Sequence, residues 1–454
     1  MRFTRSVTLP VSAADAFAWH ERPGAFERLT PPWERVDVES HVGGIRDGAR
    51  VVLRVHVGPF ATRWRLEHRD YVAGRQFHDV QLAGPFASWR HRHLFRDDGP
   101  GRSVLTDDIE LAPPLGGLGA LAAGRTIHRR LDRLFAYRHA VTAVDLARHQ
   151  PYADRAPLTV AVTGATGLIG GALTAFLTTG GHTVRRITRR PRAPGDIARD
   201  PAARRIDPGA LDGVDAVVHL AGASVDARWT EAHKREIMHS RVDGTRLVAE
   251  TIARLDRPPR VLVSGSAVGY YGSRGDEVLD ERSAPGQGFL ADVCRAWEAA
   301  AEPAERAGIR VVHPRLGVVL SPRGSALPKL LVPFRLGLGG KIGDGRAWMS
   351  CVALDDVVGA LHFALMTESL RGPANVSLPE PVTNAEFSRS LAETLHRPAA
   401  VTVPPFAVKL ALGAQQAEEM ALASQRVMPR ALLAAGFHFR HPTIGDALRF
   451  ELGR

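Results

Sequence analysis

The feature that most constrains this chain is the segment TGATGLIG at residues 163–170. It follows the short apolar run LTVAV, which is typical of a buried parallel strand, and residues with helical spacing come after it. A glycine-rich turn between such a strand and a helix lets the backbone approach a pyrophosphate, and the N–H groups at the helix start face the phosphates. The sequence therefore predicts a doubly wound parallel sheet that binds a dinucleotide at this turn.

Each glycine of this turn has a separate expected task. We expect Gly164 to make the tight turn, Gly167 to allow close backbone approach to the pyrophosphate, and Gly170 to pack the helix against the strand. The spacing is G-x-x-G-x-x-G rather than the strict G-x-G-x-x-G, but the physical demands are the same. The other residues of this turn that we expect to bind the cofactor are Thr166, Leu168 and Ile169.

The end of the second predicted strand carries cations. A site that prefers NAD(H) usually places Asp or Glu here to bind the ribose 2′-hydroxyl, whereas this chain has Thr188, Arg189, Arg190 and Arg192. Guanidinium groups suit a 2′-phosphate. NADP(H) is therefore favoured over NAD(H), and a solvated arginine run is the alternative.

Two further predicted strands end in small or polar residues. The strand at residues 214–220 is followed by small residues, where a backbone must pass close to the cofactor, and the strand at residues 260–263 leads into SGSAVGYYG. Ligands bind at the carboxyl edge of doubly wound sheets. The candidates at this edge are Leu220, Ala221, Gly222 and Ser264 for the cofactor, and Ser266, Tyr270 and Tyr271 for chemistry.

Together these segments resemble the extended and atypical short-chain dehydrogenase/reductases, in the NAD-dependent epimerase/dehydratase-like (sugar-nucleotide epimerase-like) branch. Besides the turn, the resemblance is carried by LAG at 220–222, RWT at 228–230, SR at 240–241, SAVGYYG at 266–272 and RLGVVL at 315–320. It implies a Rossmann domain over residues 158–400, a small C-terminal helical domain over residues 401–454, and a cofactor contact from Arg241.

The chain departs from ordinary short-chain dehydrogenases at their Tyr-x-x-x-Lys pair, in which the lysine lowers the tyrosine pKa for proton exchange. In the matching helix, the position of the tyrosine is occupied by Phe289 or Leu290, and the position of the lysine is occupied by Val293 or Cys294. Acid–base chemistry must then come from the candidates named above, Ser266, Tyr270 and Tyr271. The alternative is that the two tyrosines form a wall of the cofactor pocket.

A second departure lies on the substrate side. Relatives in this branch usually carry Gln, Trp and His where this chain has Ala347, Cys351 and Ala353. If those side chains hold a substrate, this protein binds a different one or none. Arg315 and Arg346 remain as cations that can bind an anionic group of a small-molecule substrate.

Residues 1–149 contain no such glycine-rich turn. Ser12 is a plausible cap for a short helix at 13–20, and a period of two places Trp89, His91, His93 and Phe95 on one face of a strand. Two histidines on one strand are too few metal ligands, so we expect no metal site and interpret them as lining a cavity. The other predicted elements are strands at 51–57, 62–68 and 103–111 and a long helix at 125–149.

Residues 1–149 resemble the START-like polyketide cyclase and ligand-binding superfamily (SRPBCC), through PVSAADAFAW at residues 10–19, GPFASW at residues 84–89 and the closing helix. The resemblance implies an α+β helix-grip domain whose cavity binds an apolar ligand. A packed module without a ligand is the alternative. Residues 150–157 form the expected linker.

Composition narrows the remaining classes. With 44% hydrophobic and 24% charged residues among 454, the chain is typical of a folded globular protein. The net charge of +11 is spread along the sequence, so no nucleic-acid partner is expected. Two cysteines and the lack of a run of about 18 apolar residues predict a cytoplasmic protein without a membrane span.

These inferences combine into one hypothesis and one alternative. The hypothesis is an NADP(H)-dependent oxidoreductase or epimerase-like enzyme whose N-terminal domain holds an apolar ligand. Because the Tyr-x-x-x-Lys pair is missing, the alternative is a non-catalytic NADP(H)-binding sensor or scaffold.

Overall fold

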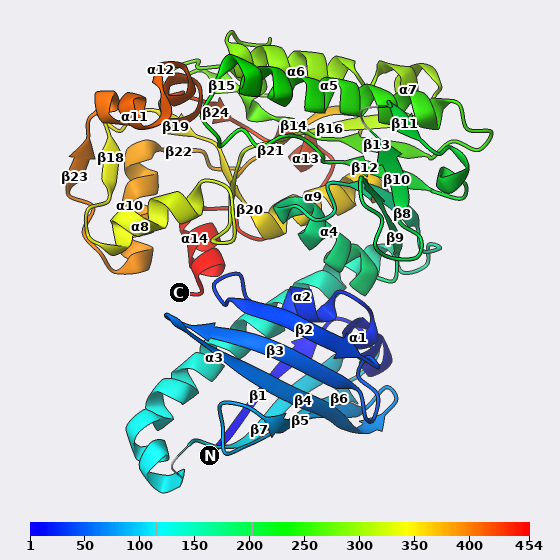
Figure 1. Cartoon of the computed structure of the whole chain (residues 1–454), viewed down its shortest axis with the longest axis vertical. Helices are drawn as coiled ribbons and strands as arrows, with labels where there is room; N and C mark the ends of the chain where they lie inside the picture. Colours follow the sequence, from blue (N-terminus) through cyan, green and yellow to red (C-terminus); the bar gives the residue numbers. More distant parts are fainter. Residues whose placement is uncertain (115, 201–202) are drawn as a thin grey trace. The chain divides into compact units, whose positions relative to one another are not determined.

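The computed structural model describes residues 1–114, 116–200 and 203–454, with side chains from 116 to 122 also outside the description. The chain forms two compact units (Figure 1). One comprises Met1–Ala156 with Thr178–Gly181 and Gly453, and the other comprises Pro157–Leu177, His182–Leu452 and Arg454. No helix in the described part of the chain has the length and apolar character needed to cross a membrane.

The first unit is built on a seven-stranded antiparallel sheet in the order β1-β7-β6-β5-β4-β3-β2. Two short helices follow β1, and one long helix closes the unit. Its elements are β1 (Arg2–Leu9), α1 (Ala13–Glu21), α2 (Ala25–Leu29), β2 (Val36–Val42), β3 (Arg50–Val57), β4 (Phe60–Val72), β5 (Gln76–Ala83), β6 (Ser88–Asp97), β7 (Ser103–Ala112) and α3 (Gly116–His149).

Local sequence explains several of these elements. The Ser12 side chain accepts a hydrogen bond from the Asp15 N–H and caps α1, as the sequence predicts. Strand β6 buries every second residue, so Trp89 and His91 face inward as expected from the period of two. A buried pair between Arg28 of α2 and Asp145 of α3, with N–O distances of 2.7 and 2.6 Å, joins the two helices.

The second unit is built on a nine-stranded sheet whose main order is β11-β10-β9-β8-β12-β13-β16-β14, with β21 pairing to β16. Its pairings are parallel except for the hairpin between β10 and β11. The elements are β8 (Thr159–Thr163), α4 (Leu168–Thr179), β9 (Thr183–Thr188), β10 (Ile197–Asp200), β11 (Arg205–Ile206), β12 (Ala216–His219), α5 (Glu231–Ala253), β13 (Val261–Ser264), β14 (Ser266–Ala267), α6 (Phe289–Ala299), α7 (Glu302–Arg306), β16 (Arg310–Leu316), α9 (Leu354–Met366) and β21 (Gly372–Val376).

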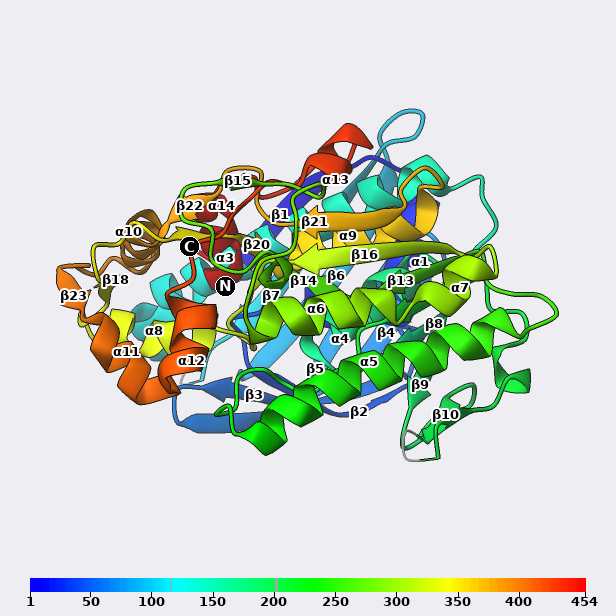
Figure 2. The same cartoon turned by 90° about the horizontal axis from the view of Figure 1, so that it is seen from above.

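Helices cover both faces of this sheet. Helices α5 and α6 lie side by side on one face, and α4 and α9 lie on the other (Figures 1 and 2). The core between α5 and the sheet contains Ala161 and Val217 of the strands and Val248 of α5, all at most 1% exposed. This is the doubly wound parallel sheet that the glycine-rich turn predicts, so that part of the fold prediction is confirmed.

The last part of the chain is mainly helical, as predicted, and two of its strands pair with strands of the preceding residues. Strand β23 (Val401–Val403) pairs with β18 (Gly340–Ile342), and β24 (Arg426–Val427) pairs with β15 (Val278–Leu279). The remaining elements are β17 (Val318–Leu320), α8 (Leu327–Arg335), β19 (Trp348–Met349), β20 (Cys351–Ala353), β22 (Val382–Thr383), α10 (Asn384–Leu395), α11 (Pro405–Leu412), α12 (Ala414–Gln416), α13 (Arg430–Ala434) and α14 (Ile444–Leu452).

Candidate functional site

The glycine-rich turn lies where the strand order reverses. The chain passes from β8 to β9 on one side, while β12 lies on the other side of β8. Gly164 has a φ of +70°, and a Cβ on it would lie 3.0 Å from the Ala221 nitrogen. A Cβ on Gly170 would lie 2.2 Å from the Gly164 oxygen. Side chains at either position would therefore collide with backbone, which explains the two glycines. Thr166 and Gly167 are exposed between them.

Thr163 joins this turn to the end of β12. Its Oγ1 accepts hydrogen bonds from the Leu220 and Ala221 N–H groups at 3.0 and 3.1 Å and lies 2.8 Å from Nδ1 of His219. Because the two N–H groups occupy both lone pairs, we assign the hydroxyl proton to the bond with His219, whose own proton is then on Nε2. Burial lowers the pKa of His219 to about 3, so this imidazole is neutral at pH 7.

Among the described residues, no carboxylate is hydrogen-bonded to Arg189 or Arg199, two arginines at this edge. Burial lowers the pKa of Arg199 on β10, and the nearby charge of Arg189 lowers it further. A Cβ on Gly244 of α5 would lie 2.9 Å from Nη2 of Arg199 and 3.5 Å from Nε2 of His219. Neither Nε of Arg199 nor Nε2 of His219 has a hydrogen-bond acceptor among the described residues. Buried donors of this kind favour an anion.

The loop after β9 is held by Asp196. Its carboxylate accepts two hydrogen bonds from Arg186 at 2.8 and 2.9 Å and bonds from the Arg192 and Ala193 N–H groups. The Arg186 guanidinium lowers the pKa of Asp196 to about 2. The Arg190 N–H donates to Oγ1 of Thr188 at 3.2 Å. The side chains of Arg189, Arg190 and Arg192 are exposed.

Arg241 of α5 lies beside Gly222, where a Cβ would come within 3.2 Å of the guanidinium carbon. Nη1 of Arg241 donates to the Ala223 carbonyl at 2.9 Å, and its guanidinium stacks on the Trp297 ring at 5.0 Å. Burial lowers the pKa of Arg241. Its described partners are neutral, so its charge is available to a ligand beyond Gly222. Ser264, at the end of β13, is buried.

The serine predicted to be catalytic belongs to a buried polar network. Ser266 is 1% exposed, and its Oγ donates to Oε1 of Glu298 at 2.6 Å. Nε and Nη2 of Arg315 donate to the two oxygens of Glu298, both at 2.8 Å. The sequence pattern did not indicate Glu298 as the partner of either residue.

The two tyrosines differ in their surroundings. The Tyr271 hydroxyl donates to Oδ1 of Asn375 at 2.7 Å and accepts from Nη1 of Arg315 at 2.9 Å. Burial raises the pKa of Tyr271 to about 12. Tyr270 is half-buried, and the Arg315 guanidinium lies 3.5 Å from its ring centroid. The structure thus brings Ser266 and both tyrosines together around Arg315, which uses three nitrogens within this network.

Arg346, the other cation predicted to bind substrate, lies outside this network. It is on an exposed turn, where its N–H donates to Oδ1 of Asp344 at 2.9 Å. The roles predicted for Ser266, Tyr270, Arg315 and Arg346 stay predictions.

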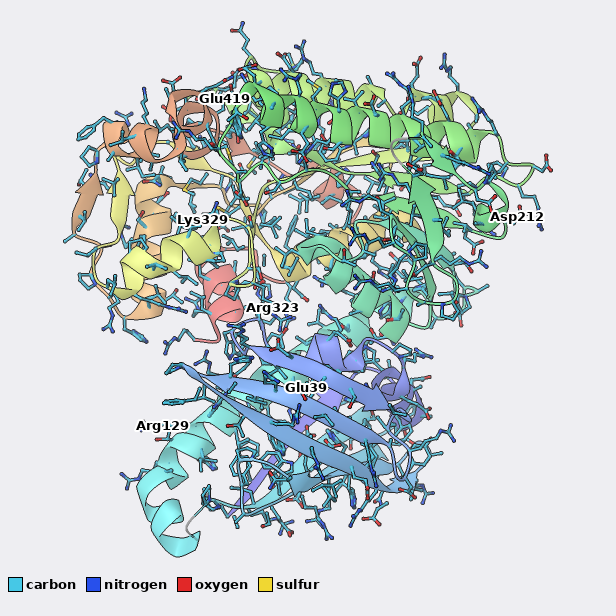
Figure 3. The ribbon with its side chains drawn as sticks, in the orientation of Figure 1. Glu39, Arg129, Asp212, Arg323, Lys329 and Glu419 are labelled. Carbon is cyan, nitrogen blue, oxygen red and sulfur yellow. The ribbon has the colours of Figure 1, made fainter. Side chains whose placement is uncertain are left out.

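Helix α6 contains the positions at which ordinary short-chain dehydrogenases have their Tyr-x-x-x-Lys pair. A Cβ on Gly269 would lie 3.2 Å from Cβ of Leu290 and 3.8 Å from Sγ of Cys294, so these two residues face the loop that contains the tyrosines. Burial raises the pKa of Cys294 to about 12, which leaves a neutral thiol. Glu419 of the C-terminal region accepts hydrogen bonds from the Phe289 and Leu290 N–H groups at 3.1 and 2.8 Å and caps the helix (Figure 3).

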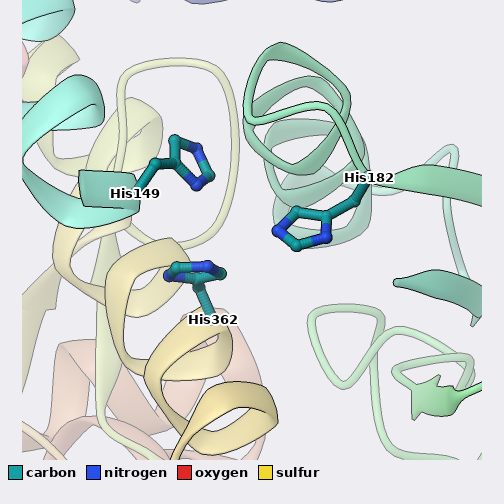
Figure 4. A group of neighbouring side chains, drawn as sticks. All are labelled: His149, His182 and His362. Carbon is teal, nitrogen blue, oxygen red and sulfur yellow. The ribbon is translucent and has the colours of Figure 1, made fainter. Parts of the chain in front are cut away.

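A pair of histidines lies on the other side of this unit. The rings of His182 and His362 lie 5.8 Å apart between centroids (Figure 4). His362 packs edge-on against Phe176, and Nδ1 of His182 accepts a hydrogen bond from the Leu158 N–H at 3.0 Å. These contacts hold α4 and α9 beside the start of β8 and give the pair a structural role in this unit.

The first unit contains a cavity of about 610 Å³ between its sheet and α3. Much of the wall is apolar and includes Leu53, Trp89 and Phe135. The polar part of the wall contains His68, Asp79, His91 and His93.

Comparisons with known proteins place these features in a family. "Epimerase family protein Mb2239" of Mycobacterium bovis is 44% identical over 297 residues, which are 65% of this chain and 98% of that protein. The chain belongs to the epimerase family. A model described as "NAD dependent epimerase/dehydratase family" matches residues 160–376, and one described as "Domain of unknown function (DUF1731)" matches residues 403–451. The predicted resemblance to the epimerase/dehydratase branch is confirmed.

Two solved structures are similar to this chain. A nucleoside-diphosphate sugar epimerase from Corynebacterium glutamicum is 36% identical with a TM-score of 0.82, over 99% of this chain and 90% of that chain. The human epimerase family protein SDR39U1, solved with NADPH, is 34% identical with a TM-score of 0.60, over 65% of this chain and 99% of that chain. The START-like resemblance of residues 1–149 stays a prediction.

Proposed function

We propose that the second unit binds NADP(H) and acts as an oxidoreductase or epimerase-like enzyme. The observation that carries the proposal is Arg199, whose buried Nε has no acceptor among the described residues and whose pKa the charge of Arg189 lowers. Paired cations without a carboxylate suit the 2′-phosphate that distinguishes NADP(H) from NAD(H). The structure of human SDR39U1 with NADPH supports this choice of nucleotide.

The residues at this edge fit a dinucleotide. The turn leaves no room for a Cβ at Gly164 or Gly170, and the residues Thr166 and Gly167 between them are exposed. We propose that the pyrophosphate binds at the start of α4, next to Leu168 and Ile169. The 2′-phosphate would then bind to Arg189, Arg199 and the N–H groups after Thr188, including that of Arg190. The remaining contacts would come from Leu220, Ala221, Gly222, Arg241 and Ser264.

A bound nicotinamide supplies or accepts a hydride, and the chain must then move a proton. We propose that Ser266 does this, because its hydroxyl already donates to a carboxylate that Arg315 holds by two hydrogen bonds. Tyr271 has both hydroxyl positions occupied within the protein, so its role is to orient Arg315. Tyr270 forms a wall of the site, and the exposed Arg346 binds an anionic group of the substrate.

The second candidate is a protein that binds NADP(H) without catalysis. It is favoured by Leu290 and Cys294, which occupy the register of the Tyr-x-x-x-Lys pair and offer no group that exchanges a proton near neutral pH.

For the first unit we propose a START-like helix-grip domain that binds an apolar small molecule. Three observations support this: an antiparallel seven-stranded sheet, a 34-residue closing helix, and a largely apolar cavity of about 610 Å³ between them.

A measurement of NADPH oxidation distinguishes the proposed enzyme from a protein that binds NADP(H) without catalysis. Wild-type protein and the variants Ser266→Ala and Tyr270→Phe are compared for NADPH affinity by calorimetry and for NADPH oxidation with panels of carbonyl compounds and nucleotide sugars. We expect Ser266→Ala to retain NADPH affinity and to lose about 10²- to 10⁴-fold in turnover, the usual range for a proton-transfer group. Tyr270→Phe, the matched control beside it, should stay within about threefold of the wild type, because it keeps the ring stacked under Arg315.

Wild-type protein that binds NADPH tightly but oxidises it with no member of either panel would favour the sensor. Equal turnover by Ser266→Ala and wild type would remove Ser266 from the mechanism.

A further inference from the structure

The sheet register in the first unit brings acidic and histidine side chains into two rows. Asp79 of β5 is the cross-strand partner of His68 on β4 and of His91 on β6. Asp107 of β7 is the cross-strand partner of His93 on β6. Asp107 and the three histidines are buried, at 2–6% exposure, and the Asp79 side chain is 20% exposed.

Three of these residues point one donor atom each at a common position. Oδ2 of Asp79 lies 3.4 Å from Nδ1 of His91 and 3.3 Å from Nε2 of His93. All three donor atoms lie within 4.8 Å of one another. Separations of 3.3 and 3.4 Å exceed the range of about 2.7–3.2 Å that good N–H···O bonds prefer. They match the edge of about 3.3 Å in a tetrahedron of ligands about 2.0–2.1 Å from a Zn²⁺ ion.

The opposite nitrogen of each histidine lies near a second carboxylate, and that of His91 is hydrogen-bonded to it. Nε2 of His91 and Nδ1 of His93 both lie 2.8 Å from Oδ1 of Asp107. The other oxygen of Asp79 lies 2.9 Å from Nε2 of His68. Metal-binding histidines usually donate their second N–H to a carboxylate, which fixes the ring and leaves the other nitrogen free for the ion. The cluster thus has an inner set of three donors, and outer partners orient two of them: Asp107 holds His91, and His68 holds Asp79.

We propose that Asp79, His91 and His93 bind a divalent transition-metal ion, with Zn²⁺ the best fit, and that its open position faces the cavity of the first unit. All three residues line that cavity. A site with three protein ligands and an open fourth position is the arrangement of catalytic rather than structural zinc centres. The ligand class that fits is an apolar molecule with one metal-binding oxygen, because the rest of the cavity wall is mainly apolar.

Sequence analysis found only two histidines on one strand and therefore missed the set of Asp79, His91 and His93. Strand alternation placed His91 and His93 on one face, but their third partner comes from the neighbouring strand, 12 residues earlier than His91. The expectation of no metal site rested on that count, and this proposal replaces it.

The test is a metal titration of the full chain after dialysis against a chelator. Co²⁺ is the first probe, because a tetrahedral Co²⁺ ion absorbs much more strongly in the visible range than an octahedral one, and Zn²⁺ is then added as competitor. We expect one Co²⁺ per chain with a tetrahedral spectrum, which stoichiometric Zn²⁺ abolishes. A wild-type protein that binds neither ion saturably, or that gives only an octahedral spectrum, would overturn the proposal without any variant.

Variants assign the site. Asp79→Asn replaces the charged inner donor by a neutral, weaker amide oxygen with little change in shape, and Asp107→Asn removes the outer carboxylate. Loss of an outer partner typically weakens metal binding about 10- to 100-fold, and we expect at least that from either variant. His78→Gln is the matched control, because His78 lies on the same strand, pairs with Asp70 at 2.8 Å and points to the other face.

The control should bind Co²⁺ as the wild type does, and far-ultraviolet circular dichroism checks that each variant is folded. Unchanged affinity in a folded Asp79→Asn protein would place the ion elsewhere and refute the assignment.

Discussion

Replacing Tyr271 by Phe tests whether this tyrosine supports the site or performs chemistry. The ring is fully buried, and its hydroxyl bridges Oδ1 of Asn375 at 2.7 Å and Nη1 of Arg315 at 2.9 Å. Phe keeps the ring and leaves no cavity, so the change isolates the hydroxyl. Both former partners would then lack a hydrogen bond in a buried position.

The expected loss follows from these two partners. An unsatisfied buried polar group costs about 1–3 kcal/mol, and more when it is charged, as Arg315 is. Tyr271→Phe should therefore lower the free energy of unfolding of the second unit by at least about 2 kcal/mol. Tyr270→Phe is the control, since the described residues offer its hydroxyl no hydrogen bond, and its effect should stay within about 0.5 kcal/mol.

The assay is urea unfolding of the full chain followed by circular dichroism, together with NADPH affinity. A pKa of about 12 means that Tyr271 is not ionised at neutral pH, so we expect a change in stability that exceeds any change specific to turnover. A Tyr271→Phe protein that is as stable as the Tyr270→Phe control would contradict the proposed bridging role. The same result with turnover abolished would restore Tyr271 as a catalytic candidate.

Three further predictions concern the second unit. Gly170→Ala and Gly171→Ala share the same gain in helix propensity, but their Cβ atoms would meet backbone oxygen at 2.2 and 3.6 Å, so urea unfolding should find Gly170→Ala less stable by about 1–3 kcal/mol. His219 keeps a pKa of about 3 when folded, below the value of about 6.5 in an unfolded chain, so only the unfolded state gains this proton as pH falls below about 6.5. Stability should then fall by up to about 1.4 kcal/mol per pH unit from this group, and His219→Gln should reduce that slope; an identical slope in the variant would refute the attribution. Glu419→Gln should cost about 1 kcal/mol by weakening the cap of α6, and amide hydrogen exchange at Phe289 and Leu290 should accelerate, whereas unchanged exchange would show that the cap is dispensable.

The structural features that can be predicted from the sequence are those that depend on residues close together in the chain. The strand, turn and helix around Gly164 follow from a buried apolar run and from glycines that leave no room for a side chain. The cap of α1 by Ser12 is equally local. The common face of His91 and His93 requires only the period of a strand.

The structural features that could not be predicted depend on contacts between residues far apart in the chain. Glu419 caps a helix that lies 130 residues earlier, and Tyr271 bonds to a residue 104 positions later. Arg199 was missed because the usual rule looks for the 2′-phosphate ligand at the end of the second strand, whereas this side chain comes from the third. Asp79 joined the histidines only through the register between strands, which local patterns do not determine.

The central claim, an NADP(H) site built on Arg199 and Arg189, is tested most directly by calorimetric titration with NADPH and NADH. Arg199→Met removes the buried charge but keeps the aliphatic stem, and Arg205→Ala is a control on the exposed side of the adjoining strand. A charge-assisted hydrogen bond contributes about 1.5–3 kcal/mol, so Arg199→Met should weaken NADPH binding about 10- to 150-fold and leave NADH binding unchanged. Wild-type protein that binds neither nucleotide, or that binds both equally with no effect of Arg199→Met, would contradict the account.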